Sequence, residues 1–336
     1  MKKIKRALIS VSDKDNLKFL LKNLNKYQIK LISSGGTYKE IKKMGFSCEE
    51  VSKYTSSPEI LSGRVKTLHP KIHAGILSKR KLKAHKNDLK KNNYNEIDLV
   101  IVNFYPLEKT LKQSKNHEKI LENIDIGGPT LVRAAAKNYN YVTIVTSISQ
   151  YEELIKNLNE NKGATSLEFR KKAALEAFGE TAYYESLIFN YFKDISPKED
   201  SKKIILGLNK FEKLRYGENP HQNGAIYTTS KNLGLEKLNG KQLSYNNYAD
   251  IFSALQISKS FPNNKGTVIV KHGNPCGASI HKNNNESFSM AHKCDPTSSF
   301  GGIVSCNFKI NRSLALKLNK LFFEVIIGNG FENDAL

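Results

Sequence analysis

The chain has 336 residues, 39% hydrophobic and 25% charged, which is typical of a globular protein large enough for two domains. It contains no run of about 18 apolar residues and no signal-peptide core, so we expect a cytoplasmic protein with no membrane contact. The net charge of +21 would suit a nucleic-acid-binding protein, but the lysines are spread over every segment without an arginine-rich tract; we predict solvated lysine-rich faces and no nucleic-acid partner.

The first 150 residues alternate apolar runs with amphipathic segments. The apolar runs predict strands at 5–12, 29–34, 97–106 and 141–147, and the amphipathic segments predict helices at 13–27, 37–45 and 128–138. Alternation of this kind predicts an α/β fold with a parallel sheet covered by helices on both faces.

A long helix and a polar linker follow. The helix is predicted at 167–192, opened by a capping box of Thr165 and Glu168. The segment 195–203 is polar and contains a proline, so we place a domain boundary there, between residues 1–197 and 198–336. Strands at 224–229 and 267–273 and a helix at 247–258 begin a second α/β region.

The turn SSGGT, residues 33–37, lies between a predicted strand and a predicted helix. Backbone N–H groups at a helix N-terminus favour an anion, and Gly35 and Gly36 let the backbone approach a phosphate closely. Carboxyl ends of neighbouring parallel strands open on one edge of a sheet. The predicted phosphate site therefore combines two strand ends: Ser10, Ser12 and Lys14 with Ser34 and Thr37.

The stretch RVKTLHPKIHAGIL, residues 64–77, gathers cations and imidazoles around Pro70. By itself it indicates either a solvated basic loop or a site for an anionic substrate. We take Pro70 to argue against a helix that would align His69 with His73, so we predict no metal there. The two histidines are expected to shape the loop through hydrogen bonds, and Lys71 to be solvated.

The four cysteines form no C-x-x-C pair, which argues against a disulfide framework or a zinc site. The segments NFYPL and ENIDIGGPTLVRAAAKN place Tyr105, Asp125 and Lys137 around a strand end and a helix. Asp125 near a helix start and Lys137 near its end also suit a purely structural role, and spacing alone leaves both interpretations open.

In the second half, LRYGENPHQ, VKHGNPCGAS and CDPTSSFGG are rich in turn residues that border strands or helices, as binding loops often are. Lys271 and His272 follow the apolar run TVIV and precede a predicted tight turn, GNPCG, so both are expected at a strand end.

In this order, RVKTLHPKIHAGIL, ENIDIGGPTLVRAAAKN, LRYGENPHQ, VKHGNPCGAS and DPTSSFGGIV closely resemble the family of bifunctional purine biosynthesis enzymes that join AICAR (aminoimidazole carboxamide ribonucleotide) formyltransferase and IMP cyclohydrolase. The resemblance covers essentially the whole chain. It implies a methylglyoxal-synthase-like (MGS-like) first domain and a cytidine-deaminase-like α/β transformylase domain.

For the first domain, the resemblance implies cyclisation of formyl-AICAR to IMP with loss of water and without a cofactor. The implied nucleotide-binding residues are Ser10, Ser12, Lys14, Ser34, Gly35, Gly36, Thr37, Arg64 and Thr67, and the implied catalytic residues are Lys66, Tyr105, Asp125 and Lys137. An intramolecular step of this kind needs orientation and proton management.

For the second domain, the resemblance implies formyl transfer from the co-substrate 10-formyltetrahydrofolate to AICAR. The implied catalytic residues are Lys271 and His272, and the implied binding residues are Arg215, Tyr216, Asn247, Ser298, Phe300 and Gly301. Family members continue beyond the region that matches residues 322–336, so we expect an intact cyclohydrolase and an incomplete transformylase. A homodimer is also implied.

Three rival functions remain. A methylglyoxal-synthase-type lyase would share the phosphate site but leaves RVKTLHPKIHAG and the second domain unexplained. An RNA-binding protein would use the positive charge, and a nucleotide sensor would bind the monophosphate without turnover.

Overall fold

The computed structural model describes residues 3–196, 201–230 and 232–336, and the chain divides into two compact units, Met1–Gly207 and Leu208–Leu336. The predicted boundary between residues 197 and 198 lies outside the described residues. Each unit has its own sheet and its own hydrophobic clusters.

Within the described residues, the first unit is built on a parallel five-stranded sheet in the order β3-β2-β1-β4-β5. The strands are β1 (Arg6–Val11), β2 (Lys30–Ser33), β3 (Glu49–Glu50), β4 (Leu99–Asn103) and β5 (Thr143–Val145). Successive side chains of a strand point to opposite faces of the sheet: Leu8 belongs to the hydrophobic cluster on one face and Ile9 to the cluster on the other. This alternation explains why helices cover both faces, as predicted.

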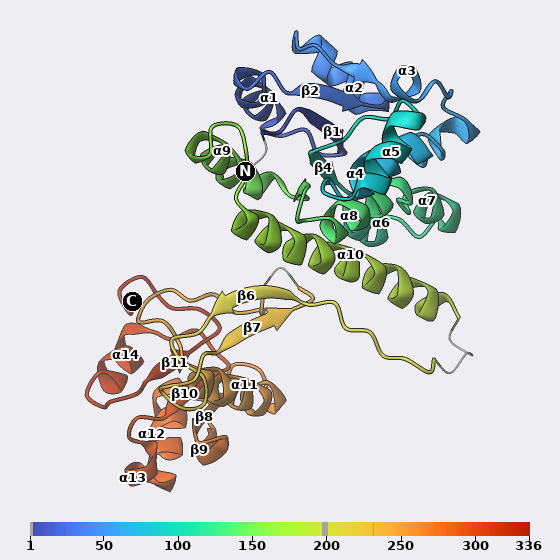
Figure 1. Cartoon of the computed structure of the whole chain (residues 1–336). Coiled ribbons are helices and arrows are strands. Elements are labelled where there is room, and N and C mark those ends of the chain that lie inside the picture. The colour runs from blue at the N-terminus through green and yellow to red at the C-terminus, as the bar shows by residue number, and fades with distance from the viewer. Residues whose placement is uncertain (1–2, 197–200, 231) are drawn as a thin grey trace. The chain divides into compact units, whose positions relative to one another are not determined.

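Helices cover both faces of this sheet and pack against the two hydrophobic clusters (Figure 1). One face carries α3 (Val51–Thr55), α4 (Pro70–Leu77), α8 (Gly127–Lys137) and α10 (Leu167–Ile195); the other carries α1 (Leu17–Lys26), α2 (Gly35–Lys43) and α9 (Tyr151–Glu160). The connections contain η1 (Leu61–Gly63), α5 (Lys83–Lys91), α6 (Leu107–Gln113), α7 (His117–Glu122) and η2 (Ile148–Gln150). Because α6 and α7 follow β4, they stand at the carboxyl edge of the sheet.

The second unit has a mixed sheet of four strands in the order β11-β10-β8-β9, in which only β10 and β11 run parallel. Its elements are β6 (Asn209–Lys213), β7 (Ala225–Thr228), α11 (Tyr245–Ser260), β8 (Gly266–Lys271), β9 (Asn274–Ile280), α12 (Asn284–Cys294), α13 (Pro296–Ser299), β10 (Ile303–Cys306), α14 (Arg312–Leu318) and β11 (Val325–Ile327). Helix α11 packs on one face, and α12 and α14 pack on the other. Strands β6 and β7 form a separate antiparallel pair.

Three local predictions were wrong. The cap of the long helix is Ser166, whose hydroxyl accepts from Phe169 N–H, whereas the Thr165 hydroxyl bonds to Thr143. The segment GNPCG was predicted as a turn, but from Asn274 onward it forms the start of β9 and pairs with β8. The turn consists of His272 and Gly273.

The third error concerns Pro70. This residue was expected in a loop but is the first residue of α4, where proline has no N–H to lose. The narrower prediction is confirmed: α4 begins after His69, so no helix aligns His69 with His73. His69 caps this helix, and its Nδ1 accepts a 3.1 Å hydrogen bond from Lys71 N–H.

Candidate functional site

A cavity of about 750 Å³ lies at the carboxyl edge of the first unit's sheet. It collects side chains from the ends of β1, β2 and β4 and from the loops before α4 and α8. Eleven of the predicted residues line it: Ser10, Ser12, Lys14, Ser34, Gly36, Thr37, Arg64, Lys66, Thr67, Tyr105 and Asp125. Gly35 borders it, because a Cβ there would lie 3.5 Å from Lys66 Nζ. Parallel pairing of the strands brings these segments to one edge.

Ser34 occupies the N-cap position of α2 at the floor of this cavity. Its side chain makes no capping hydrogen bond, and its Oγ is buried without a partner in the described part of the structure. Buried polar atoms are nearly always paired, so this hydroxyl is an open position for a ligand atom. With the first N–H groups of α2 beside it, the position suits a phosphate oxygen.

Two side chains hold the end of β1 in place, one from α2 and one from the end of β4. The Thr37 hydroxyl donates to Val11 C=O at 2.9 Å and accepts from Val11 N–H at 3.1 Å. The Asn103 carboxamide, at the end of β4, accepts from Ser12 N–H at 2.6 Å and from Asp13 N–H at 3.0 Å. These bonds hold the Ser12 turn in place without using the Ser12 hydroxyl.

The loop before α4 forms one wall of the cavity and is backbone-strained. Leu61, Ser62 and Gly63 have φ values of 52°, 54° and 91° in succession. Non-glycine residues in this region cost on the order of 1 kcal/mol or more each, and such strain gathers at ligand clamps. The Arg64 guanidinium pairs with the Glu122 carboxylate on α7, but both side chains are more than half exposed, so this pair contributes little stability.

Asp125 also lines the cavity, just before α8. Burial raises the pKa of its carboxyl group, while hydrogen bonding from Gly128 N–H, 2.8 Å from Oδ1, and the charge of Lys66 lower it. The Lys66 ammonium therefore stabilises the charged form of the Asp125 carboxyl group. A base with a raised pKa and a neighbouring cation is an arrangement suited to proton transfer.

Neither His69 nor His73 lines the cavity. His69 shapes the loop by capping α4, as predicted; burial lowers the pKa of His73 and so favours its neutral form. Lys71 is not simply solvated, because its Nζ lies 4.9 Å from the centre of the Tyr54 ring.

In the second unit, the predicted Lys271 and His272 lie at the end of β8. Lys271 Nζ donates to the Phe300 carbonyl at 2.7 Å. The Asp250 carboxylate on α11 accepts from the N–H groups of His272 and Gly273, at 3.1 and 2.6 Å. His272 has a φ of 54°, so a carboxylate from the neighbouring helix holds a turn in which the exposed imidazole is presented.

The remaining predicted residues of this unit make local contacts. The Arg215 guanidinium lies 4.8 Å from the centre of the Tyr216 ring and donates to its hydroxyl at 2.9 Å. Asn247 is buried at the start of α11, where its Oδ1 accepts from Ser244 N–H and its Nδ2 donates to Glu324.

Ser298 and Gly301 flank Phe300 near α13. The Asp295 carboxylate accepts from Ser298 N–H at 2.9 Å, and hydrogen bonds from Ser298 lower its pKa. Gly301 has a φ of 73°, which favours glycine there. The hydrogen bond from Lys271 to Phe300 connects the end of β8 to this segment. Asn247 and Asp250 both lie on α11.

Two family models match the chain: an MGS-like domain at residues 16–130, and the AICARFT/IMPCHase bienzyme at residues 135–336, which is more than half of the chain. The chain belongs to the AICARFT/IMPCHase bienzyme family.

Curated relatives agree with this membership. Proteins named "Bifunctional purine biosynthesis protein PurH" from Clostridioides difficile and Aquifex aeolicus are each 42% identical, over 99% and 98% of this chain, and one from Lactobacillus acidophilus is 43% identical over 99%. The chain spans about two thirds (66%) of the length of each. A crystal structure of ForH is similar with a TM-score of 0.51 and 28% identity, covering 56% of this chain and 96% of that one.

One residue expected from the AICARFT/IMPCHase resemblance is not brought to the cavity. Lys137 is the exposed last residue of α8, whose first residue, Gly127, lines the cavity. At 1.5 Å per residue, the two ends of this helix are about 15 Å apart. The structure therefore separates Lys137 from Lys66 and Asp125.

Two residues of this AICARFT/IMPCHase family member that support the site escaped sequence reasoning. Asn103 could have been found as the polar residue that ends an apolar strand at the correct edge. Tyr184 could not, because its hydroxyl meets Asp125 N–H, 59 residues earlier, only through packing of α10.

The described residues contain no group of three or more His, Cys, Asp or Glu placed to hold a metal ion. In the same part of the chain, no helix has both the length and the apolar character needed to cross a membrane.

Proposed function

We propose that the first unit catalyses the cyclisation of formyl-AICAR to IMP with release of water, and that the second unit carries residues for formyl transfer to AICAR. Family membership supports both activities, and the carboxyl-edge cavity supports the first. The observation that carries the proposal is the pairing, in one cavity, of an open anion position at Ser34 with the facing groups Lys66 and Asp125.

In the proposed complex, the nucleotide phosphate occupies the N-terminus of α2. Ser34 Oγ and the first N–H groups of the helix donate to the phosphate oxygens, and Lys14 and the Ser12 hydroxyl approach from the end of β1. Asn103 and Thr37 keep that end rigid, so little ordering is needed on binding.

Ring closure joins two groups of the same molecule. The carboxamide nitrogen attacks the formyl carbon, and it loses one proton as the new C–N bond forms. The formamide nitrogen then loses its own proton and forms a C=N bond as the C–O bond breaks. The former formyl oxygen takes up two protons and leaves as water. Asp125 is the proposed proton acceptor, and Lys66, aided by Tyr105, the proposed donor to the oxygen. Orientation supplies much of the acceleration, because an intramolecular attack needs the two groups only to be held in line. Lys137 takes no proposed step, since it lies at the far end of α8.

For the second unit, the AICAR amine is delocalised into its ring, so formyl transfer from 10-formyltetrahydrofolate needs a base and a stabiliser of the formyl oxygen. His272 is the proposed base and Lys271 the proposed stabiliser, with nucleotide contacts from the segments around Arg215, Asn247 and Phe300. From the family resemblance we also propose that the protein is a homodimer and that it is cytoplasmic.

The deciding experiment supplies formyl-AICAR to the full chain and follows IMP by its absorbance. We expect turnover, with a loss of about 10²-fold or more in Lys66→Met and near-normal rates in the matched control Lys71→Met, which does not line the cavity. Turnover of a triose phosphate to methylglyoxal instead, or IMP binding without any turnover, would contradict the proposal.

A second assay starts from AICAR and 10-formyltetrahydrofolate and measures formyl transfer separately. Measured against whatever transfer the parent chain shows, we expect a loss in His272→Ala with unchanged cyclisation in the same protein. Loss of both activities together would point to misfolding rather than to a role in transfer, and retention of both would remove His272 from the proposal.

A further inference from the structure

The first unit has a second hollow, the amino-edge pocket, on the opposite edge of the same sheet. Its volume is about 810 Å³, within the range of small-molecule sites. The starts of β1 and β2, the segment before β4, helix α5 and the ends of α1 and α9 form its walls. None of its lining residues lines the carboxyl-edge cavity.

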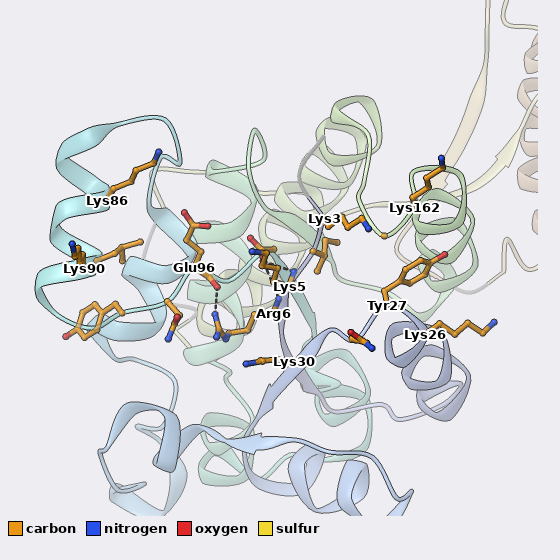
Figure 2. Close-up of a pocket in the computed structure, with 17 residues that line it drawn as sticks. Lys3, Lys5, Arg6, Lys26, Tyr27, Lys30, Lys86, Lys90, Glu96 and Lys162 are labelled. Atoms are coloured by element: carbon orange, nitrogen blue, oxygen red, sulfur yellow. Dashed lines mark hydrogen bonds between the residues drawn. The ribbon is translucent and has the colours of Figure 1, made fainter.

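The amino-edge pocket is strongly cationic. Eight of its seventeen lining residues are basic, compared with 53 of 336 in the whole chain, so basic residues are about three times as frequent in the lining. The basic residues are Lys3, Lys5, Arg6, Lys26, Lys30, Lys86, Lys90 and Lys162. In Figure 2, Lys86 and Lys90 of α5 lie on one side, Lys26 and Lys162 lie on the other, and Lys3, Lys5, Arg6 and Lys30 lie between them.

The two acidic residues of the pocket are already engaged elsewhere. Glu96 and Asp98 lie 3.7 and 3.9 Å from the guanidinium of the buried Arg80. Asp98 Oδ2 also accepts from the N–H groups of Lys5 and Arg6 at the start of β1, at 2.9 and 3.3 Å. Among the described residues, no lysine of the pocket forms an ion pair. The lysine charges are therefore not balanced within this part of the protein.

Helix ends account for only part of this cluster. Lys26 and Lys90 lie in the last turns of α1 and α5 and Lys162 follows α9, positions where a helix dipole favours a cation. The dipole gives no reason for Lys3 and Lys30 at strand starts, or for Lys86 in the middle of α5. Like charges around one hollow repel each other, and a multivalent anion relieves that repulsion.

Two tyrosines, Tyr27 and Tyr94, also line the pocket. The Tyr27 ring is held in place, because its hydroxyl donates to Asn159 Oδ1 at 2.7 Å. A fixed aromatic ring beside a cationic hollow suits a ligand that combines a phosphate chain with a planar group.

We propose that the amino-edge pocket binds a triphosphate chain, either that of a nucleoside triphosphate or free tripolyphosphate. A triphosphate carries more negative charge than the single phosphate of a nucleoside monophosphate, and its longer chain extends to more of the lysines that line the pocket. This site is separate from the proposed catalytic cavity and does not depend on its assignment.

The test titrates the full-length chain with tripolyphosphate, ATP and a single-stranded RNA at about 0.1 M salt, with calorimetric detection. The probe variant is K86E/K90E. The matched control, K83E/K91E, makes the same charge change on the same helix at residues outside the pocket. We expect tripolyphosphate affinity to fall about tenfold or more in the probe variant and to stay within about twofold in the control.

The remaining outcomes decide between ligand sources and rivals. Tighter binding of ATP than of tripolyphosphate identifies a nucleoside triphosphate as the ligand. Equal binding shows that the phosphate chain alone is recognised. Both results support the proposed triphosphate site. Three results overturn the proposal. An equal loss of tripolyphosphate affinity in both variants indicates an effect of overall charge, and an unchanged affinity in K86E/K90E indicates another site. Binding of RNA but not of triphosphates indicates a nucleic-acid surface. Should the double variant fail to fold, Lys30→Gln and its control Lys39→Gln, on α2 and outside the pocket, repeat the comparison.

Discussion

The backbone N–H of Asp125 donates a 2.7 Å hydrogen bond to the hydroxyl of Tyr184, a residue on the long helix α10. The same hydroxyl donates to Asn123 C=O at 3.3 Å, and burial raises the pKa of Tyr184 to about 12, so it stays protonated. Helix α10 thus sets the position of the carboxylate in the proposed catalytic cavity.

Tyr184→Phe removes this link and leaves the Asp125 N–H without its partner. We expect the free energy of unfolding to fall by about 1–3 kcal/mol and the kcat for cyclisation to fall more than KM rises, because the carboxylate loses its position rather than the substrate its contacts. Chemical denaturation and steady-state kinetics measure the two effects. The control is Tyr191→Phe, also on α10, because the Tyr191 hydroxyl contacts only the exposed His117 of α7 in the described structure. Equal effects of the two variants would remove Tyr184 from the positioning role.

We expect Asp125 to give the proposed cyclisation its pH dependence. Because burial raises the pKa of this carboxyl, we expect kcat to rise with pH through a midpoint above the ordinary carboxyl range, and Asp125→Asn to lose that limb along with about 10²–10⁴-fold in rate. A rate independent of pH between about 4 and 7 would contradict this prediction.

The same raised pKa has a consequence for stability. The folded state binds the Asp125 proton more tightly than the unfolded state, so the stabilising contribution is present at low pH and is lost as pH rises through the folded pKa. Asp125→Asn keeps an acceptor for Gly128 N–H and carries no charge. We therefore expect this variant to melt no lower than the parent at pH 7, as differential scanning calorimetry can measure.

Two adjacent serines separate stability from binding. Ser33 Oγ is buried and donates to Ile9 C=O at 2.7 Å, whereas Ser34 Oγ is buried without a partner in the described structure. We expect Ser33→Ala to lower the unfolding free energy by about 0.5–1.5 kcal/mol, and Ser34→Ala to leave stability unchanged while weakening IMP binding about tenfold. Calorimetric titration with IMP and urea unfolding test the pair. Loss of stability in Ser34→Ala with intact IMP affinity would reverse the assignment.

Asp250 holds the His272 turn in the second unit. Asp250→Ala leaves two backbone N–H groups without their carboxylate, and the turn also contains a non-glycine residue at positive φ. We expect faster amide hydrogen exchange at His272 and Gly273 and reduced formyl transfer, with little change in global stability because the turn is exposed. Glu286→Gln on α12 is the control. Unchanged exchange at both amides would contradict the prediction.

Much of the first unit's site was predictable because it depends on strand direction. Apolar runs identified β1, β2, β4 and β5, and in parallel strands the residues after each run share one edge. The convergence of Ser12, Ser34 and Tyr105 on one cavity follows from that rule alone. The failed predictions were local: Pro70 and the GNPCG segment were read as breaks, although both suit the regular elements in which they lie.

The sequence by itself determined the fold class, the family and the edge of the sheet at which the predicted nucleotide site lies, because hydrophobic period and motif order are properties of the chain. Tertiary packing alone decided that Lys137 lies away from the cavity, that Tyr184 holds Asp125, and that lysines from five separate segments surround a second pocket. These relationships join residues far apart in the chain. Such contacts depend on how helices pack against the sheet, which no local pattern of residues encodes.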